Sequence, residues 1–348
     1  MATIWQTVDL GCCQGHGQKV TSVTWEPGGA RLASASSDGT VRVWHAASCT
    51  CLGICQGHSG AVNCVAWAPN AEQLASASDD RSVRIWSAAT RECVGACRGH
   101  QNSVVSVAWS PHGDLLASAS DLTIRLWDAR TFAWVGACIG HDGLVHSVAW
   151  APLGQRLAST SWDRSLRLWD ATSRSCLATC TGHTDRVYCV AWDHEGGRLA
   201  TGSSDDTVRL WDATAWASLG VCPGRGGGGV VWAVAWEGGE RLVAASSDGT
   251  VRLWAASSCC CLGLCRAHHG AVLAMSMVAP RLEKAVLATA SADCTVRLWE
   301  GTLLELATAP RPDDEVEQSQ AGGSAAGSSD GRASIDASVQ SRAVASRG

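Results

Sequence analysis

The sequence predicts an all-β protein built from seven copies of one unit. A tryptophan closes each copy, and successive tryptophans are 42, 41, 42, 42, 43 and 45 residues apart. In six copies a histidine stands 27 to 31 residues before that tryptophan. Short apolar segments and turn residues lie between the two, and this period is typical of a seven-bladed β-propeller of four-stranded antiparallel blades. The tryptophans are Trp44, Trp86, Trp127, Trp169, Trp211, Trp254 and Trp299, and the histidines are His16, His58, His100, His141, His183 and His268.

The second copy shows the expected elements of one unit. Residues 62–67 read Val-Asn-Cys-Val-Ala-Trp and alternate as the residues of a half-buried strand do. Residues 74–78 read Leu-Ala-Ser-Ala-Ser, and the aspartates that follow them favour a turn because their side chains bond nearby backbone groups. Residues 83–86, Val-Arg-Ile-Trp, then predict a third strand.

These recurring residues resemble those of WD-repeat proteins over roughly residues 3 to 309. The resemblance implies a hydrogen-bonded chain of His, Ser, Asp and Trp inside each blade. In the second copy its members are His58, Ser76 or Ser78, Asp80 and Trp86. Catalytic sites do not occur in sixfold copies, so we interpret the repeated His–Asp pair as structural. The expected chain residues are His16, Asp38, Trp44, His58, Asp80, Trp86, His100, Asp121, Trp127, His141, Asp163, Trp169, His183, Asp206, Trp211, Asp248, Trp254, His268, Asp293 and Trp299.

Three copies depart from the common pattern. The third lacks one residue before Asp121, which predicts a tightened turn. The sixth has Gly224-Arg225 in place of Gly-His, followed by four glycines that we interpret as a flexible entry loop. The seventh carries about three extra residues around 281–285, which predict a longer loop.

The resemblance also indicates how the ring closes. The outermost strand of one blade precedes the histidine of the next copy, so residues 3–13 are expected to close the ring against the last copy. Residues 303–309 compete for the same place, and we favour the N-terminal strand. The chain then divides into a propeller at residues 1–309 and a disordered acidic and Ser-Gly-Ala tail at residues 310–348.

Charge and hydropathy narrow the classes of function that the chain can have. The formal net charge is −5 and the chain has two lysines, so no basic stripe for direct nucleic-acid binding is expected. No apolar run approaches 18 residues, which argues against a membrane span. We expect a cytoplasmic or nuclear protein without a cofactor or a metal.

The chain has 18 cysteines, and several lie in pairs four residues apart, such as Cys51 and Cys55. Such pairs are about 13 Å apart on a strand, too far for one zinc or one disulfide. We interpret the recurring cysteines as small apolar side chains of the outermost strands. The run Cys259-Cys260-Cys261 is also compatible with soft-metal binding or acylation.

The residues that vary between copies are the candidates for function. By the resemblance, partners bind at the third and fifth residues after the histidine and at the residue before the turn aspartate. In copies four to six these positions are Leu144, His146, Trp162, Arg186, Tyr188, Asp205 and Trp232. Trp, Tyr and Arg anchor many protein interfaces, which predicts a partner-binding surface on the upper face. The competing interpretation is that Trp162 and Trp232 only pack between blades.

These observations favour a non-enzymatic scaffold that brings protein or peptide partners into a complex. The reason is that the sequence shows no unique nucleophile or acid–base pair. An enzyme is the alternative from another class of function. Two narrower alternatives remain. The Val-Ala-Trp and Leu-Ala-Ser-Ala-Ser segments resemble the WD-repeat component of cytosolic iron–sulfur protein assembly. Trp127-Asp128-Ala129-Arg130 resembles the motif of substrate receptors of cullin-based ubiquitin ligases, in which Arg130 would contact the cullin adaptor.

Overall fold

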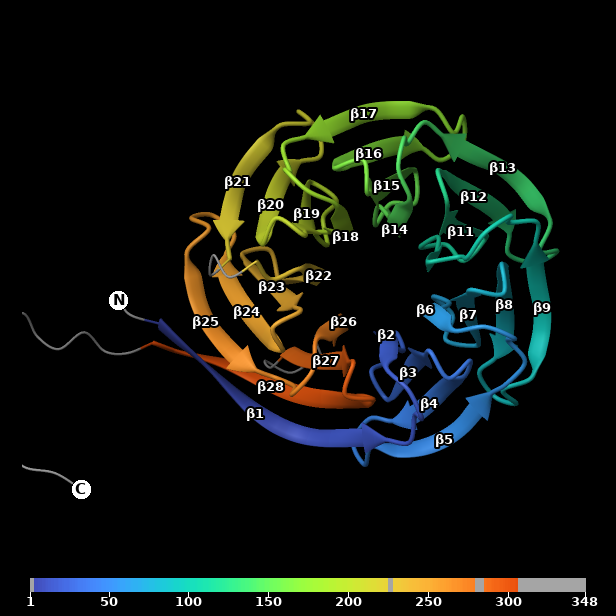
Figure 1. Ribbon diagram of the computed structural model, residues 1–348, viewed down its shortest axis with the longest axis horizontal. Coiled ribbons are helices and arrows are strands. Elements are labelled where there is room, and N and C mark those ends of the chain that lie inside the picture. The colour runs from blue at the N-terminus through green and yellow to red at the C-terminus, as the bar shows by residue number, and fades with distance from the viewer. Residues whose placement is uncertain (1–2, 225–227, 279–284, 306–348) are drawn as a thin grey trace, which may run out of the picture. The chain divides into compact units, whose positions relative to one another are not determined.

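Seven four-stranded antiparallel sheets form a closed ring in the computed structural model (Figure 1). The structure describes residues 3–224, 228–278 and 285–305. Within those residues every regular element is a strand. The fold class predicted from the sequence, an all-β seven-bladed propeller, is confirmed. The predictions for Arg225, for residues 281–284 and for the tail at 310–348 concern residues outside the described part of the chain.

Each of the first six blades is a meander of four consecutive strands, running from the centre of the ring to its rim. Blade one is β2 (Val20–Trp25), β3 (Arg31–Ser36), β4 (Val41–His45) and β5 (Thr50–Cys55). Blade two is β6 (Val62–Trp67), β7 (Gln73–Ser78), β8 (Ser82–Ser87) and β9 (Cys93–Arg98). Blade three is β10 (Ser106–Trp109), β11 (Leu115–Ser120), β12 (Thr123–Asp128) and β13 (Trp134–Ile139). Blade four is β14 (Val145–Trp150), β15 (Arg156–Ser161), β16 (Ser165–Asp170) and β17 (Cys176–Thr181). Blade five is β18 (Val187–Trp192), β19 (Arg198–Ser203), β20 (Thr207–Asp212) and β21 (Ser218–Pro223). Blade six is β22 (Val231–Glu237), β23 (Arg241–Ser246), β24 (Thr250–Ala255) and β25 (Cys261–Arg266).

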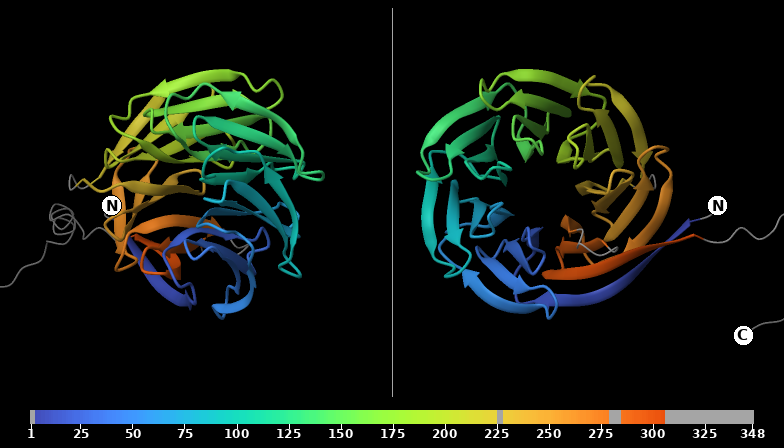
Figure 2. Two further views of the ribbon diagram at one scale, coloured as in Figure 1. Left: turned by 45° about the vertical axis from the view of Figure 1, so that its right-hand side comes forward. Right: turned by 180° about the vertical axis from the view of Figure 1, so that it is seen from behind.

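Blade seven joins the two ends of the propeller. It contains β26 (Val272–Val278), β27 (Ala285–Ser291), β28 (Thr295–Glu305) and, as its outermost strand, β1 (Thr3–Gln14). The β1–β28 ladder runs antiparallel from the pair Thr3 and Glu305 to the pair Gln14 and Thr295. Figure 2 shows the same arrangement from two further directions. Closure by the N-terminal strand is therefore confirmed, and it covers the edge that β28 would otherwise expose.

The segment expected to compete with β1 has a different place. Residues 303–305 continue β28 beyond the length of the other third strands and pair with residues 3–5 of β1. The two segments are thus partners in one ladder over these residues. Residues 306–309 of the competing segment lie outside the described part of the chain.

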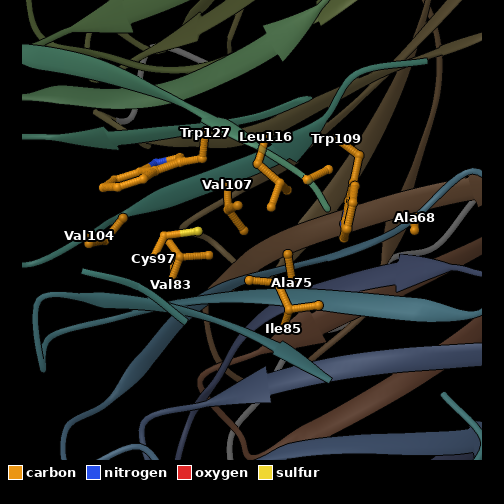
Figure 3. Close-up of a cluster of buried hydrophobic side chains, with 12 residues drawn as sticks. Ala68, Ala75, Val83, Ile85, Cys97, Val104, Val107, Trp109, Leu116 and Trp127 are labelled. Carbon is orange, nitrogen blue, oxygen red and sulfur yellow. The ribbon is translucent and has the colours of Figure 1, made fainter. Parts of the chain in front are cut away.

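The apolar core lies between neighbouring blades. Figure 3 shows one such cluster, in which Val83 and Ile85 of blade two pack with Leu116 and Trp127 of blade three. Five of the six tryptophans at or next to the ends of innermost strands, all except Trp67, add hydrogen bonds across the same seams. Trp109, for example, donates its indole N–H to the carbonyl of Ala66 in blade two at 3.3 Å. Each blade therefore depends on both neighbours for burial of its faces.

A chain of side-chain hydrogen bonds ties the layers of blade two together. Nδ1 of His58 lies 2.6 Å from Asp80, and its Nε2 lies 2.7 Å from the hydroxyl of Ser76. The indole of Trp86 donates to the same hydroxyl at 2.7 Å. Ser78 lies outside this chain, and its hydroxyl accepts the N–H of Asp80 instead. Blades one, four, five and seven have equivalent chains, with Thr201 and Thr289 as the hydroxyl in blades five and seven.

In blade five the structure corrects the predicted carboxylate partner of His183. His183 bonds Asp205 at 2.8 Å, and the predicted partner Asp206 stands one position further along. Asp206 has a φ of 63° and occupies the left-handed turn position that Arg81 and Arg164 occupy in other blades. The sequence has two adjacent aspartates here, Asp205 and Asp206, and the prediction chose the second as the partner of His183 although the first makes the bond. Asp206 instead lies 3.6 Å from the Arg252 guanidinium of blade six.

Blade three has an incomplete chain. His100 bonds the hydroxyl of Ser118 at 2.6 Å, and Trp127 bonds it at 2.7 Å. No hydrogen bond joins His100 to Asp121, so the prediction for Asp121 was wrong. The turn is one residue shorter than in blade two, and the Asp121 carboxylate accepts a bond from Asn102. Burial without a carboxylate partner lowers the pKa of His100 to about 4.

Blade six replaces the chain with an ion pair. Ala244 stands where other blades have the hydroxyl, and Asp248 lies 2.5 Å from the guanidinium of Arg252. The Arg252 side chain is buried and bridges Asp248 to Asp206 of blade five. A buried arginine of this kind requires its carboxylate partners, because an unpaired charge in the interior is costly.

The paired cysteines of the outermost strands have unequal surroundings. Cys55, Cys97 and Cys180 are buried, whereas their partners four residues earlier are exposed. Among the described residues no group of three or more His, Cys, Asp or Glu side chains is arranged to hold a metal ion. The same part of the chain contains no helix long and apolar enough to cross a membrane.

Removal of β1 is expected to open the ring. A variant that lacks residues 1–14 loses the whole β1–β28 ladder and exposes the edge of β28. We expect its melting temperature to fall by roughly 10 °C or more, while removal of residues 310–348 shifts it by less than about 2 °C. Thermal unfolding followed by circular dichroism checks this. Equal melting temperatures for the two truncations would contradict closure by β1.

The pH dependence of stability is expected to depend on His100. Its folded pKa of about 4 lies below the value of about 6.5 in an unfolded chain, so the unfolded chain binds more protons between these values. The free energy of unfolding is therefore retained above about pH 6.5 and falls as the pH drops towards about 4. We expect the wild type to lose on the order of 2 kcal/mol more than His100→Gln between about pH 7 and pH 4.5. Urea unfolding curves at both pH values measure this, and parallel losses in the two proteins would refute it.

Candidate protein-binding surface

In six of the seven blades the fold places one side chain of the innermost strand outside the regular ladder; β10 of blade three has no such register shift. In β14 the pairing register shifts between Val145 and Ser147, so His146 is a bulge residue. Tyr188 of β18 and Trp232 of β22 occupy the same bulge in blades five and six. A bulge leaves a residue unpaired and redirects its side chain. The fifth position after each histidine is therefore available for side chains that the ladder does not require.

These three bulge residues meet because their strands are neighbours around the centre of the ring (Figure 1). The ring centroids of Tyr188 and Trp232 are 4.4 Å apart with an angle of 54° between the planes. His146 lies edge-on to Tyr188 at 4.8 Å and 83°. Separations and tilts of this order are the ones that aromatic pairs prefer.

Trp162 and Arg186 extend this group towards solvent. Trp162 stands in the turn between β15 and β16, and 38% of its surface is exposed. The guanidinium carbon of Arg186 lies 4.3 Å from the centroid of the Trp162 ring, which is a cation–π contact. The Trp162 ring is also 6.3 Å from that of Tyr188. We call His146, Trp162, Arg186, Tyr188 and Trp232 the aromatic cluster.

The aromatic cluster has one exposed charged side chain and one hydrogen-bond donor without a partner. Burial lowers the pKa of His146, so its ring is neutral at neutral pH, and its Nδ1 donates to the Tyr188 carbonyl at 2.8 Å. Arg186 is exposed and supplies the positive charge. The indole nitrogen of Trp232 is buried and has no hydrogen-bond partner among the described residues. A buried donor without a partner is uncommon in a folded protein, and a hydrogen-bond acceptor placed beside it would satisfy it.

Two of the seven residues predicted for this surface, Asp205 and Leu144, also take part in the structure of their own blades. Asp205 bonds His183 and belongs to the blade's own hydrogen-bonded chain, so it is the turn aspartate itself and not the residue before it. Its contact with a partner stays a prediction. Ser204 is the residue before the turn aspartate in blade five. Leu144 is half-buried, and its carbonyl accepts the N–H of Trp162 at 2.9 Å. It therefore holds the turn that carries Trp162.

The competing interpretation, in which these side chains pack between blades, fits part of what the bulge residues do. In blade one, Thr21 occupies the bulge and donates to the carbonyl of Val62 in blade two. In blade two, Asn63 occupies the bulge and donates its side-chain amide N–H to the carbonyl of Val104 in blade three. The bond from His146 to Tyr188 follows this pattern, so His146 also fastens blade four to blade five.

Arg130 lies on the opposite face of the ring. Its side chain is exposed in the turn between β12 and β13, at the other end of β12 from Asp121. The Asp128 carboxylate orders this turn by accepting the N–H groups of Arg130 and Thr131. The structure also shows an exposed apolar group on β13 that the repeat pattern does not single out: Trp134 is 62% exposed and Ile139 is 73% exposed.

The seven copies match a known family. The family described as WD domain, G-beta repeat, matches residues 8–45, 49–87, 91–128, 134–170, 174–212, 216–255 and 259–300. Each match begins at or near the outermost strand of one blade and ends at the third strand of the next, in agreement with closure by β1. The search of curated proteins found no match. Because the seven segments cover well over half of the chain, the protein belongs to the WD-repeat family.

Proposed function

We propose that the protein is a non-enzymatic scaffold that binds a protein or peptide partner through the aromatic cluster on blades four to six. Propellers of this family are generally protein-interaction scaffolds. The observation that supports this site is the stack of Arg186 on the exposed ring of Trp162, next to Tyr188 and Trp232. Large aromatic and arginine side chains with an exposed edge are the usual anchors of interfaces.

The chemistry of the aromatic cluster favours a particular kind of ligand. Tyr188 is itself buried, with 7% of its surface exposed, so it supports the neighbouring rings. An apolar or aromatic side chain of a ligand would bury surface against Trp162 and the half-buried Trp232, each Å² contributing about 25 cal/mol. A carboxylate beside it would pair with Arg186, because His146 is neutral. An acceptor such as a peptide carbonyl would satisfy the indole of Trp232. We therefore infer a peptide segment that combines an apolar anchor with an acidic residue.

The narrower alternatives stay predictions. The exposed side chain of Arg130 is compatible with contact to a cullin adaptor, and such a contact would leave the upper face free for a substrate. The cytoplasmic or nuclear location and the role in iron–sulfur protein assembly have no structural observation behind them beyond the sequence features that suggested them.

Substitution of the exposed anchor is expected to remove binding without unfolding the protein. Arg186→Glu reverses the charge of an exposed side chain, and we expect partner binding to fall at least tenfold while the melting temperature stays within about 1 °C. The double variant Tyr188→Ala with Trp232→Ala is expected to abolish capture. Affinity capture from an extract followed by mass spectrometry identifies the partner, and titration of the purified partner measures the affinity.

Trp134→Ala is the matched control, because this tryptophan is exposed on β13 and lies outside the aromatic cluster. It should bind the partner as the wild type does. If Arg186→Glu binds normally and the double variant loses capture only together with a large fall in melting temperature, the cluster is a packing element and the proposal fails.

A further inference from the structure

Five of the seven seams between blades share one contact at the rim. The turn between the third and fourth strands of a blade has a residue with positive φ, for example 60° at Phe132 and 61° at Arg174. In these five seams the residue lies against a glycine on the outermost strand of the preceding blade. A side chain at Gly95 would overlap the ring of Phe132, and one at Gly136 would overlap Arg174. The glycine therefore makes room for a side chain that inserts from the next blade.

In two seams the inserted residue is a cysteine. Cys49 of blade one and Cys259 of blade six have the same φ of 53°. A Cβ at Gly11 of β1 would be 2.8 Å from the sulfur of Cys49. A Cβ at Gly220 of β21 would be 2.7 Å from the sulfur of Cys259. Both sulfurs thus lie directly on the outermost strand of the neighbouring blade.

A buried cysteine follows each of these glycines by two residues, on the same side of the strand. Cys13 follows Gly11, and Cys49 packs against the cluster that contains Cys13. Cys222 follows Gly220, and Cys259 packs against the cluster that contains Cys222. Burial first, and then the hydrogen-bonded thiol of Cys49, raise the pKa of Cys13.

We propose that Cys13 with Cys49, and Cys222 with Cys259, are two redox-sensitive thiol pairs that form disulfides across the seams between blades seven and one and between blades five and six. The other five seams lack this arrangement among the described residues. Cys55, Cys97, Cys138 and Cys180 face Arg91, Phe132, Arg174 and Trp216 in the equivalent turns, and Cys265 of blade six accepts a hydrogen bond from the Thr7 hydroxyl of β1 at 3.2 Å.

The reaction needs a thiol oxidant such as oxidised glutathione. The more accessible thiol of Cys49, which is half-buried, attacks one sulfur of that disulfide and loses its proton, and one reduced glutathione leaves. The Cys13 thiol then attacks the Cys49 sulfur of the mixed disulfide, and the second reduced glutathione leaves. Two thiols are oxidised, one glutathione disulfide is reduced, and one S–S bond forms. Cys259 and Cys222 follow the same steps.

The first pair bears on closure of the ring. Cys13 lies on β1, the strand that completes blade seven. A bond from Cys13 to Cys49 attaches β1 to blade one as well as to β28. The second pair fastens blade six, whose own hydrogen-bonded chain is replaced by the Arg252 ion pair. Both disulfides are therefore expected to stabilise the ring.

Disulfide mapping in the folded full-length chain tests the proposal. The reduced protein is incubated with oxidised glutathione, its remaining thiols are alkylated, and the unreduced protein is digested with trypsin for mass spectrometry. We expect tryptic peptide 210–225, whose one cysteine is Cys222, to be linked to peptide 253–266. Peptide 1–19 should be linked to peptide 43–81. The melting temperature of the oxidised protein should rise by about 3 °C or more.

Matched serine variants assign the sulfurs. Cys49→Ser and Cys13→Ser should each lose the first link, whereas Cys51→Ser and Cys12→Ser should keep it. Cys259→Ser should lose the second link, and Cys260→Ser should keep it. The alkylation is done after the oxidised protein has been unfolded in denaturant, because Cys13 and Cys222 are buried in the folded chain. The proposal is overturned if both cysteines are then recovered fully alkylated, or if the links persist in Cys49→Ser and Cys259→Ser.

Discussion

The seven blades depend on mutual burial. Val83 and Ile85 of blade two are covered by Leu116 and Trp127 of blade three, and the same relation repeats around the ring. A blade at an open end would leave one apolar face in water, at a cost of about 25 cal/mol for each Å². The ladder between β1 and β28 removes both ends at once, because it joins the first residues of the propeller to the last. Closure is thus the constraint on which the stability of every blade depends.

Within this ring the hydrogen-bonded chains are local reinforcements. Blades three and six show that the ring forms even where a blade lacks a complete hydrogen-bonded chain. Blade three retains the His100–Ser118–Trp127 part and lacks the carboxylate. Blade six has Arg252 paired with Asp248 and Asp206. The neighbouring blades cover both, so the cost of an incomplete chain is small against the inter-blade burial. A shorter turn in one blade therefore changes the pKa of a histidine and leaves the fold intact.

The fold was predictable from the sequence because its determinants are local and repeated sevenfold. Alternation, the aspartate turn and the closing tryptophan recur at one period, and each defines a strand or a turn by itself. The assignment of Asp206 failed because both aspartates of the doublet satisfy the local pattern. The structure shows the rule that separates them: the chain carboxylate stands four residues after the chain hydroxyl, as Asp80 does after Ser76 and Asp205 after Thr201. The same count gives three residues from Ser118 to Asp121, which the missing bond of blade three reflects.

The candidate site was predictable only as a set of positions. Its contacts depend on the order of blades around the ring and on the bulge at the second residue of the innermost strands of blades four, five and six. A bulge residue makes no ladder pair, so its side chain can change without loss of backbone hydrogen bonds. Thr21 and Asn63 use this freedom to bond the next blade, whereas Tyr188 and Trp232 use it to gather aromatic surface. His146 does both, since it bonds the Tyr188 carbonyl and contacts the Tyr188 ring. The same position thus serves cohesion in blades one and two and, in the function that we propose, recognition in blades five and six. On that proposal the side chain at the bulge, rather than the repeat itself, carries the information about function.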